Sequence, residues 1–360
     1  MSRTSVAFRV DADADIGIGH LRRCLTLAAA LKQRGCDIRF VTRHRLRHDL
    51  APALASYSTG ALERMPGEPD GGDLSSERGD AERTLALLGH PPTDSCWVVI
   101  DSYRLGRLWE RTIRSAGFRI CAIDDYRNRL HHADLLVSDS ELPFDPALND
   151  VGGTSRHLVG RRYALLDADF RAAEYAPSTG PIRVLVCYGG SDPTGETLKG
   201  LAALRILGND RNLCERVGRI DVVVGPANRH VADVERAIEQ IRDAVVHRAP
   251  PSLPPLMRMA DLVLTAGGNT MIEALALRRT CIVTVTGDHQ ASMVARLKAE
   301  ELIYSLGGHA ATTPNDVLAM LARALNEGGS MAARIRSVAP FDHLGAGRVA
   351  DAMLAPAAPA

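Results

Sequence analysis

A histidine that follows two closely spaced glycines is the first candidate for chemistry in this sequence. It closes the segment 11–20, which reads DADADIGIGH. A β-like run precedes the segment and a helical pattern follows it, so it lies where α/β sheets present ligand loops. Gly17 and Gly19 allow the backbone to turn tightly and approach a ligand, and the N–H groups that open the following helix attract anions. We therefore expect a ligand site at this loop.

His20 stands in the first turn of the helix predicted at about residues 20–34. The helix dipole disfavours a protonated imidazole there, so the ring is expected to be neutral near neutral pH and able to accept a proton. The alternative is that His20 only caps the helix. The match to a dinucleotide-binding fingerprint is weak, because Arg22 stands where the third glycine is needed. A calcium loop is excluded, because Ile16 and Arg22 replace its glycine and its glutamate.

Two more glycine-bearing segments follow predicted strands in the second half of the chain. The first, at 188–192, reads YGGSD and precedes a predicted helix. Its residues Gly189, Ser191 and Asp192 suit a loop that wraps a phosphate or a ribose.

The second of these segments, at 265–270, reads TAGGNT and closes a strand before another helix. The N–H groups of Gly268, Asn269 and Thr270 are suited to a diphosphate, and Glu273, one turn into the helix, to both ribose hydroxyls. This arrangement predicts a nucleoside diphosphate as ligand. The alternative is a capping box in which Thr270 and Glu273 only stabilise the helix.

Several catalytic classes lack their motifs in this sequence. It contains no GxSxG elbow, no GxxxxGK[ST] loop and no HExxH. Asp124 and Asp125 end a predicted strand and could form a carboxylate dyad. Consecutive strand residues point to opposite faces, however, so at most one of the two is expected to reach the site.

The composition predicts no nucleic-acid or membrane partner. Lys plus Arg equals Asp plus Glu at 43 each, so the sequence has no overall electrostatic attraction for polyanions. The seven cysteines never form CxxC, which predicts buried thiols and no metal site. The sequence shows neither a signal-peptide pattern nor an apolar run of about 20 residues, so the expected location is the cytoplasm.

A chain of 360 residues is expected to form two domains. Short apolar strands alternate with helical patterns, which is typical of doubly wound, Rossmann-like α/β domains. Strands are expected at 5–10, 38–42, 96–100, 119–123, 183–187, 221–224, 244–247, 262–265 and 281–285, and helices at 20–34, 107–116, 194–207 and 229–240. The linker-like segment 175–181 separates domains 1–175 and 176–360, with a last helix free to return to the first domain. Two such domains predict a central cleft.

Eight segments, read together, resemble the PseG family of UDP-sugar hydrolases, which is related in fold to MurG-type glycosyltransferases. The segments are RVDADADIGIGHLRRCLTLA, VVIDSYRLGRLWE, AIDDYRNRLHHADLL, LVGRRYALLDADF, VCYGGSDPTGET, ADLVLTAGGNTMIEAL, GDHQ and FDHLGAGRVA. They occur in the family's order over nearly the whole chain. The resemblance implies a GT-B architecture in which the second domain holds UDP and the sugar faces the first glycine loop, with no metal and no cofactor.

The resemblance also implies roles for individual residues. The family's catalytic histidine falls on His20, its Arg-x-Asp on Arg9 and Asp11, and its active-site tyrosine on Tyr103. Its nucleotide-binding loops fall on Gly189, Ser191, Asp192, Gly268, Asn269, Thr270 and Glu273.

Three departures from the family concern positions that lie near its sugar. The family's sugar-contacting Asn-Gln falls on His289 and Gln290, so asparagine is replaced. Ser102 replaces a histidine, and the segment 138–140 reads SDS in place of Asp-Gln-Asn. Because of these departures, the alternative that the substrate is a related sugar stays open.

The activity implied by the resemblance is hydrolysis of a UDP-linked diacetamido-trideoxy sugar, with inversion, in pseudaminic acid biosynthesis. UDP leaves as a stable anion, so one base and anion stabilisation suffice without a second carboxylic acid. Two alternatives stay open. One is a GT-B glycosyltransferase that passes the sugar from a nucleotide-sugar donor to an acceptor hydroxyl, and the other is an inactive nucleotide-sugar-binding module.

Overall fold

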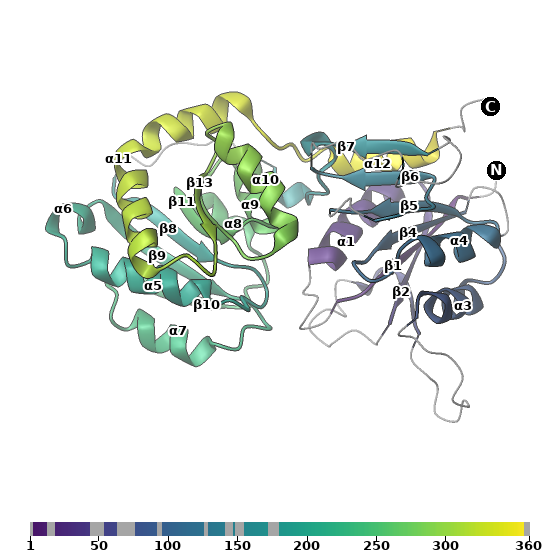
Figure 1. The fold of residues 1–360 in the computed structure, drawn as a ribbon, viewed down its shortest axis with the longest axis horizontal. Coiled ribbons are helices and arrows are strands. Elements are labelled where there is room, and N and C mark those ends of the chain that lie inside the picture. Colours follow the sequence, from purple (N-terminus) through teal and green to yellow (C-terminus); the bar gives the residue numbers. More distant parts are fainter. Residues whose placement is uncertain are drawn as a thin grey trace. The chain divides into compact units, whose positions relative to one another are not determined.

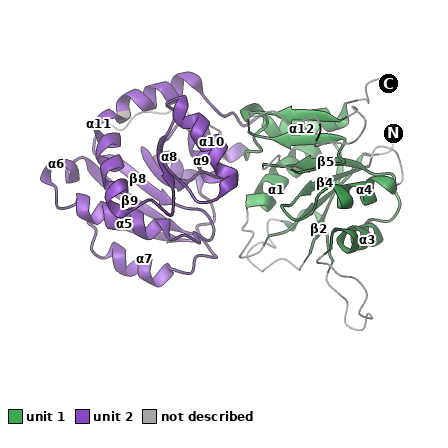
Figure 2. Ribbon diagram, viewed as in Figure 1, with its two compact units in different colours: residues 1–167, 344–360 green, residues 168–343 purple. Residues whose placement is uncertain are grey.

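A sheet of parallel strands forms the centre of each half of the chain (Figure 1). The structure is a computed structural model that describes residues 3–12, 19–43, 54–62, 76–91, 96–125, 129–140, 147, 155–171 and 180–355. The chain divides into unit 1, Met1–Asp167 with Leu344–Ala360, and unit 2, Ala168–His343 (Figure 2). The units thus meet in sequence after Asp167, not at residue 175, and most of the segment 175–181 lies outside the described residues.

Unit 1 contains a seven-stranded sheet in the order β3-β2-β1-β4-β5-β6-β7. All its strand pairs are parallel. The strands are β1 (Ser5–Val10), β2 (Asp37–Thr42), β3 (Ser58–Ala61), β4 (Trp97–Asp101), β5 (Arg119–Ile123), β6 (Leu135–Ser138) and β7 (Arg156–Val159). The strand order reverses between β1 and β4, and open α/β sheets bind ligands beyond the carboxyl ends of the strands at such a point.

Helices cover both faces of this sheet. They are α1 (Gly19–Gln33), α3 (Glu77–Leu88), α4 (Arg107–Ser115) and the last helix, α12 (Gly345–Leu354), with a short 3₁₀ turn, η2 (Arg161–Tyr163). On one face, Leu27 and Leu31 of α1 pack with Val349 of α12 in a single apolar core. On the other face, Trp109 and Ile113 of α4 close a second core. The central strands are therefore buried on both sides, as parallel strands are.

The last helix belongs to unit 1 through specific contacts. Arg34, the residue after α1, donates to Asp351 at 2.7 Å and to the carbonyl oxygen of Gly347 at 3.3 Å. A methyl group on Gly345 would lie 2.1 Å from the carbonyl oxygen of Ala164, so the start of α12 touches the backbone that follows η2. Only glycine allows this approach.

Unit 2 contains a six-stranded sheet in the order β10-β9-β8-β11-β12-β13, again with parallel pairs. Its strands are β8 (Ile182–Cys187), β9 (Val217–Val224), β10 (Ala244–Arg248), β11 (Leu262–Ala266), β12 (Thr280–Val285) and β13 (Tyr304–Gly308). Its helices are η3 (Ala168–Phe170), α5 (Glu196–Leu207), α6 (Arg211–Cys214), α7 (Val231–Ile238), α8 (Pro254–Met259), α9 (Asn269–Ala276), α10 (Asp288–Ala299) and α11 (Pro314–Val338). The strand order reverses between β8 and β11.

All nine strands expected from apolar runs are present within a few residues of their predicted ends. The doubly wound α/β class is confirmed as well. Six of the seven cysteines are buried, as predicted. Among the helices that the structure describes, none combines the length and the apolar character needed to cross a membrane.

Candidate active site

His20 lies beside a carboxylate at the point where the strand order of unit 1 reverses. The residue is the second of α1, which follows β1, and Asp101 is the last of the neighbouring strand β4, where it pairs with Val10. The Nδ1 atom of His20 lies 2.6 Å from Oδ1 of Asp101. Both side chains are buried. The sheet topology thus joins two residues that are 81 positions apart in sequence.

The contact with Asp101 fixes the tautomer of His20. An unprotonated Nδ1 would face a carboxylate oxygen at 2.6 Å with two lone pairs opposed, so Nδ1 carries the hydrogen and donates it. In the neutral ring, Nε2 then holds the lone pair. A histidine arranged in this way can take a proton through Nε2 while the carboxylate stabilises the resulting cation.

Arg23, one turn further along α1, holds the same carboxylate. Its Nε and Nη2 atoms donate to the two oxygens of Asp101 at 2.5 and 2.7 Å, and its Nη1 donates to Asp125 at 2.7 Å. Burial by itself raises the pKa of Asp101, but the charge of Arg23 and the contact with His20 outweigh it and hold that pKa well below its usual range. Asp101 is therefore an anion wherever the protein is folded near neutral pH.

Tyr103 and Asp125 complete this group. The Tyr103 ring meets the His20 ring edge-on, with 4.6 Å between centroids, and its hydroxyl donates to Oδ2 of Asp125 at 3.3 Å. The other oxygen of Asp125, Oδ1, is buried and has no partner among the described atoms. The adjacent Asp124 instead contacts His131. The two aspartates thus point apart, and only Asp125 reaches the His20 group, as the strand pattern predicts.

The structure gives Arg9 a role different from the expected ligand contact. Its side chain is fully buried, and its guanidinium donates to both oxygens of Asp80 on α3 at 3.0 and 2.6 Å and to both oxygens of Asp11. Asp11 also accepts the backbone N–H of Arg43 at 2.7 Å. Arg9 is thus a support beneath the loop, because no part of it is left to touch a substrate.

Of the two glycines in the first loop, Gly19 begins α1 and Gly17 lies outside the described residues. The glycine turn itself, residues 13–18, also lies outside them. The part of the predicted loop that the structure describes therefore consists of its two ends, residues 11–12 and 19–20.

The loop after β8 is held by its own backbone and by Asp192. Gly189 has φ +83°, and a methyl group on Gly225 would lie 2.3 Å from the carbonyl oxygen of Gly190, so two loops touch through glycine backbone. The carboxylate of Asp192 accepts the N–H groups of Glu196 and Thr197, each at 2.9 Å. Asp192 therefore caps α5, and it shapes the loop that contains Gly189 and Ser191 instead of presenting a free carboxylate.

The start of α9 excludes the capping-box alternative. The helix begins at Asn269, and its N-cap residue, Gly268, has no side chain that could cap it. Thr270 is already inside the first turn, so it cannot act as the capping residue for Glu273. The first N–H groups of a helix have no partner in the helix itself and favour an anion. Glu273 is buried one turn further on.

Gln290 joins the loop after β11 to the loop after β12. Its Oε1 accepts the backbone N–H of Gly267 at 3.1 Å and that of Thr286 at 3.0 Å. The side chain is buried, while its neighbour His289 is partly exposed. Gln290 thus fixes the backbone immediately before the α9 terminus.

Asp101 and Arg23 are the site residues that the sequence analysis did not select. The feature of the sequence that could have revealed them is Asp101 itself, an aspartate at the end of a buried strand. The first and fourth strands must be known to be neighbours before that aspartate can be placed beside His20. Arg23 follows His20 by three residues, the spacing that puts two side chains on one helix face.

Comparison with known proteins gives weak sequence matches and strong structural ones. No protein-family profile matches the chain. The chain is 29% identical over 161 residues to the spore coat polysaccharide biosynthesis protein SpsG of Bacillus subtilis, which covers 44% of this chain and 45% of that protein. It is 22% identical over 298 residues to an uncharacterized protein of Methanocaldococcus jannaschii, covering 79% of this chain and 56% of that one. The matches therefore span about half the length of each relative.

Solved structures match over nearly the whole chain. Acinetobacter baumannii MurG superposes with a TM-score of 0.65 and 14% identity over 97% of this chain and 99% of its own. The glycosyltransferase of kitacinnamycin superposes with a TM-score of 0.64 and 15% sequence identity over 98% of each chain. A Streptomyces glycosyltransferase, SsfS6, was solved with thymidine diphosphate. It superposes with a TM-score of 0.56 and 13% sequence identity over 97% of this chain and 100% of its own. With two doubly wound parallel sheets that match these enzymes, the chain has the GT-B fold.

Proposed function

We propose that this protein hydrolyses a UDP-linked diacetamido-trideoxy sugar to the free sugar and UDP, with His20 as the general base. The observation that carries the proposal is the 2.6 Å contact between His20 Nδ1 and Asp101, which leaves Nε2 as the proton acceptor. The substrate rests on the resemblance of eight segments to the UDP-sugar hydrolases of pseudaminic acid biosynthesis.

The reaction is a single displacement at the anomeric carbon. Nε2 of His20 takes a proton from water while the water oxygen forms a bond to that carbon. The bond from the carbon to the UDP oxygen breaks, and its electron pair leaves with UDP. The proton on His20 then passes to solvent. One displacement inverts the anomeric configuration, and UDP needs no proton to leave, so a single base is sufficient.

Each neighbour of His20 has a part in this step. Asp101 orients the imidazole and stabilises its cation, and Arg23 keeps Asp101 ionised and in place. The Tyr103 ring packs edge-on against the imidazole of His20. The buried oxygen of Asp125 that has no partner is a candidate acceptor for a substrate N–H or O–H group.

The nucleotide is assigned to unit 2. The uncapped start of α9, at Gly268, Asn269 and Thr270, supplies N–H groups for the diphosphate, and Glu273 is assigned to the ribose. The loop with Gly189 and Ser191 lies at the same switch point. Thymidine diphosphate in a structural neighbour of the same fold supports a nucleoside diphosphate ligand.

A glycosyltransferase is the second candidate, because the neighbours named above include glycosyltransferases. In that case His20 would take the proton of an acceptor hydroxyl in place of water. The donor and the base would be the same. The two functions differ only in what attacks the anomeric carbon.

Incubation of the protein with a panel of UDP-acetamido sugars, without acceptor, separates these functions. Mass spectrometry should detect equal amounts of free sugar and UDP accumulating with time in the wild type and far less in a His20→Asn variant. Tight binding of the UDP-sugar with no release of either product, unless an acceptor is added, would identify a transferase. Binding without turnover under every condition would identify a binding module.

A further inference from the structure

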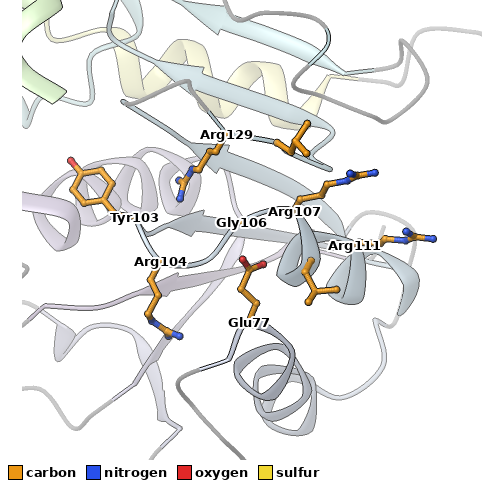
Figure 3. Close-up of a pocket in the computed structure, with 9 residues that line it drawn as sticks. Glu77, Tyr103, Arg104, Gly106, Arg107, Arg111 and Arg129 are labelled. Atoms are coloured by element: carbon orange, nitrogen blue, oxygen red, sulfur yellow. The ribbon is translucent and has the colours of Figure 1, made fainter. Parts of the chain in front are cut away.

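A pocket of about 580 Å³ lies wholly within unit 1, beside the His20 group (Figure 3). Among the described residues that line it, four are arginines, namely Arg104, Arg107, Arg111 and Arg129, and one, Glu77, is acidic. Its volume is within the range of small-molecule sites. None of the functions proposed above uses it.

Two of the arginines are anchored in the wall. Arg129 donates to the carbonyl oxygen of Ser102 at 2.8 Å and pairs with Asp124 at 3.3 Å. Arg104 donates to Asp80 at 2.8 Å. Each of these buried carboxylates also serves a second cation, since Asp80 holds Arg9 and Asp124 contacts His131. Those second cations have carboxylates of their own, because Arg9 also pairs with Asp11 and His131 with Glu110, so Arg104 and Arg129 are held in ion pairs at the wall.

The other two arginines lie on α4, four residues apart and so on one helix face. Figure 3 shows Arg107 and Arg111 extending to the same side of the pocket. Glu77 is already engaged, because its Oε2 accepts the backbone N–H of Trp109 in the first turn of α4 at 2.9 Å. Arg107 and Arg111 thus bring two guanidinium groups to one side of the pocket, in a geometry that suits an oxyanion.

Apolar side chains form the rest of the lining. Leu108, Leu130 and Tyr103 are 53, 42 and 42% exposed, although large apolar side chains are usually covered. Their exposure beside guanidinium groups fits an occupant that has an apolar part next to its charge. Tyr103 also packs against His20, so it forms a wall shared by this pocket and the proposed catalytic group.

We propose that this pocket binds a second ligand, distinct from the nucleotide sugar: a small molecule that carries a phosphate or carboxylate group next to an apolar group. The arginines bind the anion and the leucines cover the apolar part. The occupant contacts Tyr103 and thereby lies next to the reacting centre.

Phenyl phosphate is a suitable probe, because it combines the two features, and inorganic phosphate is its polar control. Calorimetric titration of the full chain at low salt should give saturable binding of phenyl phosphate, with weaker binding of inorganic phosphate. Binding should weaken as salt is added. UDP at saturating concentration should not displace the probe, because the nucleotide is assigned to unit 2.

Charge reversal at the exposed Arg111 tests the location. Arg111→Glu should weaken phenyl phosphate binding roughly 10- to 100-fold, since hydrogen bonds between charged groups are strong. Arg242→Glu, at an exposed position in unit 2, is the matched control and should leave the affinity unchanged. A second variant, Arg107→Ala, should also weaken binding.

Displacement by UDP, equal affinity in wild type and Arg111→Glu, or no saturable binding at millimolar probe would overturn the proposal. All these measurements are made without a UDP-sugar. Their outcome is therefore separate from the outcome of the hydrolysis assay.

Discussion

Asp101 and His20 meet across the switch point of the first sheet, at 2.6 Å, and Arg23 grips the two oxygens of the same aspartate. The arrangement turns Nδ1 of the imidazole toward a carboxylate and leaves Nε2 as the nitrogen for a proton transfer. It also keeps the partner carboxylate ionised, because the charge of Arg23 lowers the pKa of Asp101 against the effect of burial.

Replacing His20 by Asn should reduce turnover of the UDP-sugar by about 10²- to 10⁴-fold, the usual contribution of a general base. UDP affinity should stay near the wild-type value, because the nucleotide is assigned to unit 2. Single-turnover rates and a UDP titration measure the two effects separately. Wild-type turnover in this variant would remove His20 from the mechanism.

Asp101→Asn should reduce turnover by a similar factor of roughly 10² or more, because an amide neither fixes the Nδ1–H tautomer nor stabilises the imidazole cation. The matched control is Asp351→Asn, which removes an exposed carboxylate paired with Arg34. The control should show unchanged kcat and KM. If both variants are equally active, Asp101 has no part in orienting His20.

Stability should fall as pH rises through about 9, because His131 is a buried cation. Burial by itself lowers the pKa of His131, but its hydrogen bonds with Asp124 and Glu110 raise it from 6.5 to about 9. The pKa of His131 is thus higher in the folded than in the unfolded protein. Its contribution to the free energy of unfolding is therefore complete below pH 6.5 and is lost between that value and about pH 9. It amounts to on the order of 3 kcal/mol.

Chemical denaturation at a series of pH values checks this prediction. Wild-type stability should decline over that pH window, and His131→Gln should be less stable at pH 6 and lack this part of the decline. A variant with the same pH dependence as the wild type would show that another group titrates.

Gly225→Ala should weaken UDP binding. The added methyl would lie 2.3 Å from the carbonyl oxygen of Gly190, so the loop after β8 must move. Such overpacking typically costs about 1–3 kcal/mol in stability as well. Gly329→Ala is the control, since its methyl meets nothing within 4 Å. Thermal unfolding and UDP titration should separate the two variants, and equal behaviour would show that the loop tolerates the shift.

The sequence predicts the strands well because a strand buried on both faces must be apolar throughout. Trp97–Asp101 and Leu262–Ala266 are examples in which a short apolar run ends in a polar loop. Weaker or shorter strands such as β3, at Ser58–Ala61, were not predicted, because half-exposed residues in an edge strand have no apolar pattern.

The candidate site is harder to predict because its contacts join distant parts of the chain. Arg9 looks like a ligand residue when it is read with Asp11 alone. Its true partner, Asp80, is 71 positions away on a helix that was not predicted. Likewise, Thr270 and Glu273 match the letters of a capping box, but the helix begins two residues earlier than that motif requires. Local spacing cannot decide either case.

The return of α12 to unit 1 affects the order in which the two units can be completed during synthesis. Unit 2 is continuous in sequence, so all its strands are available once residue 343 has been made. Unit 1 lacks one covering helix until residues 344–355 follow, and Leu27 and Leu31 stay without Val349 until then. A chain shortened by this last helix should therefore retain a folded unit 2 and expose the apolar face of α1, the helix that carries His20.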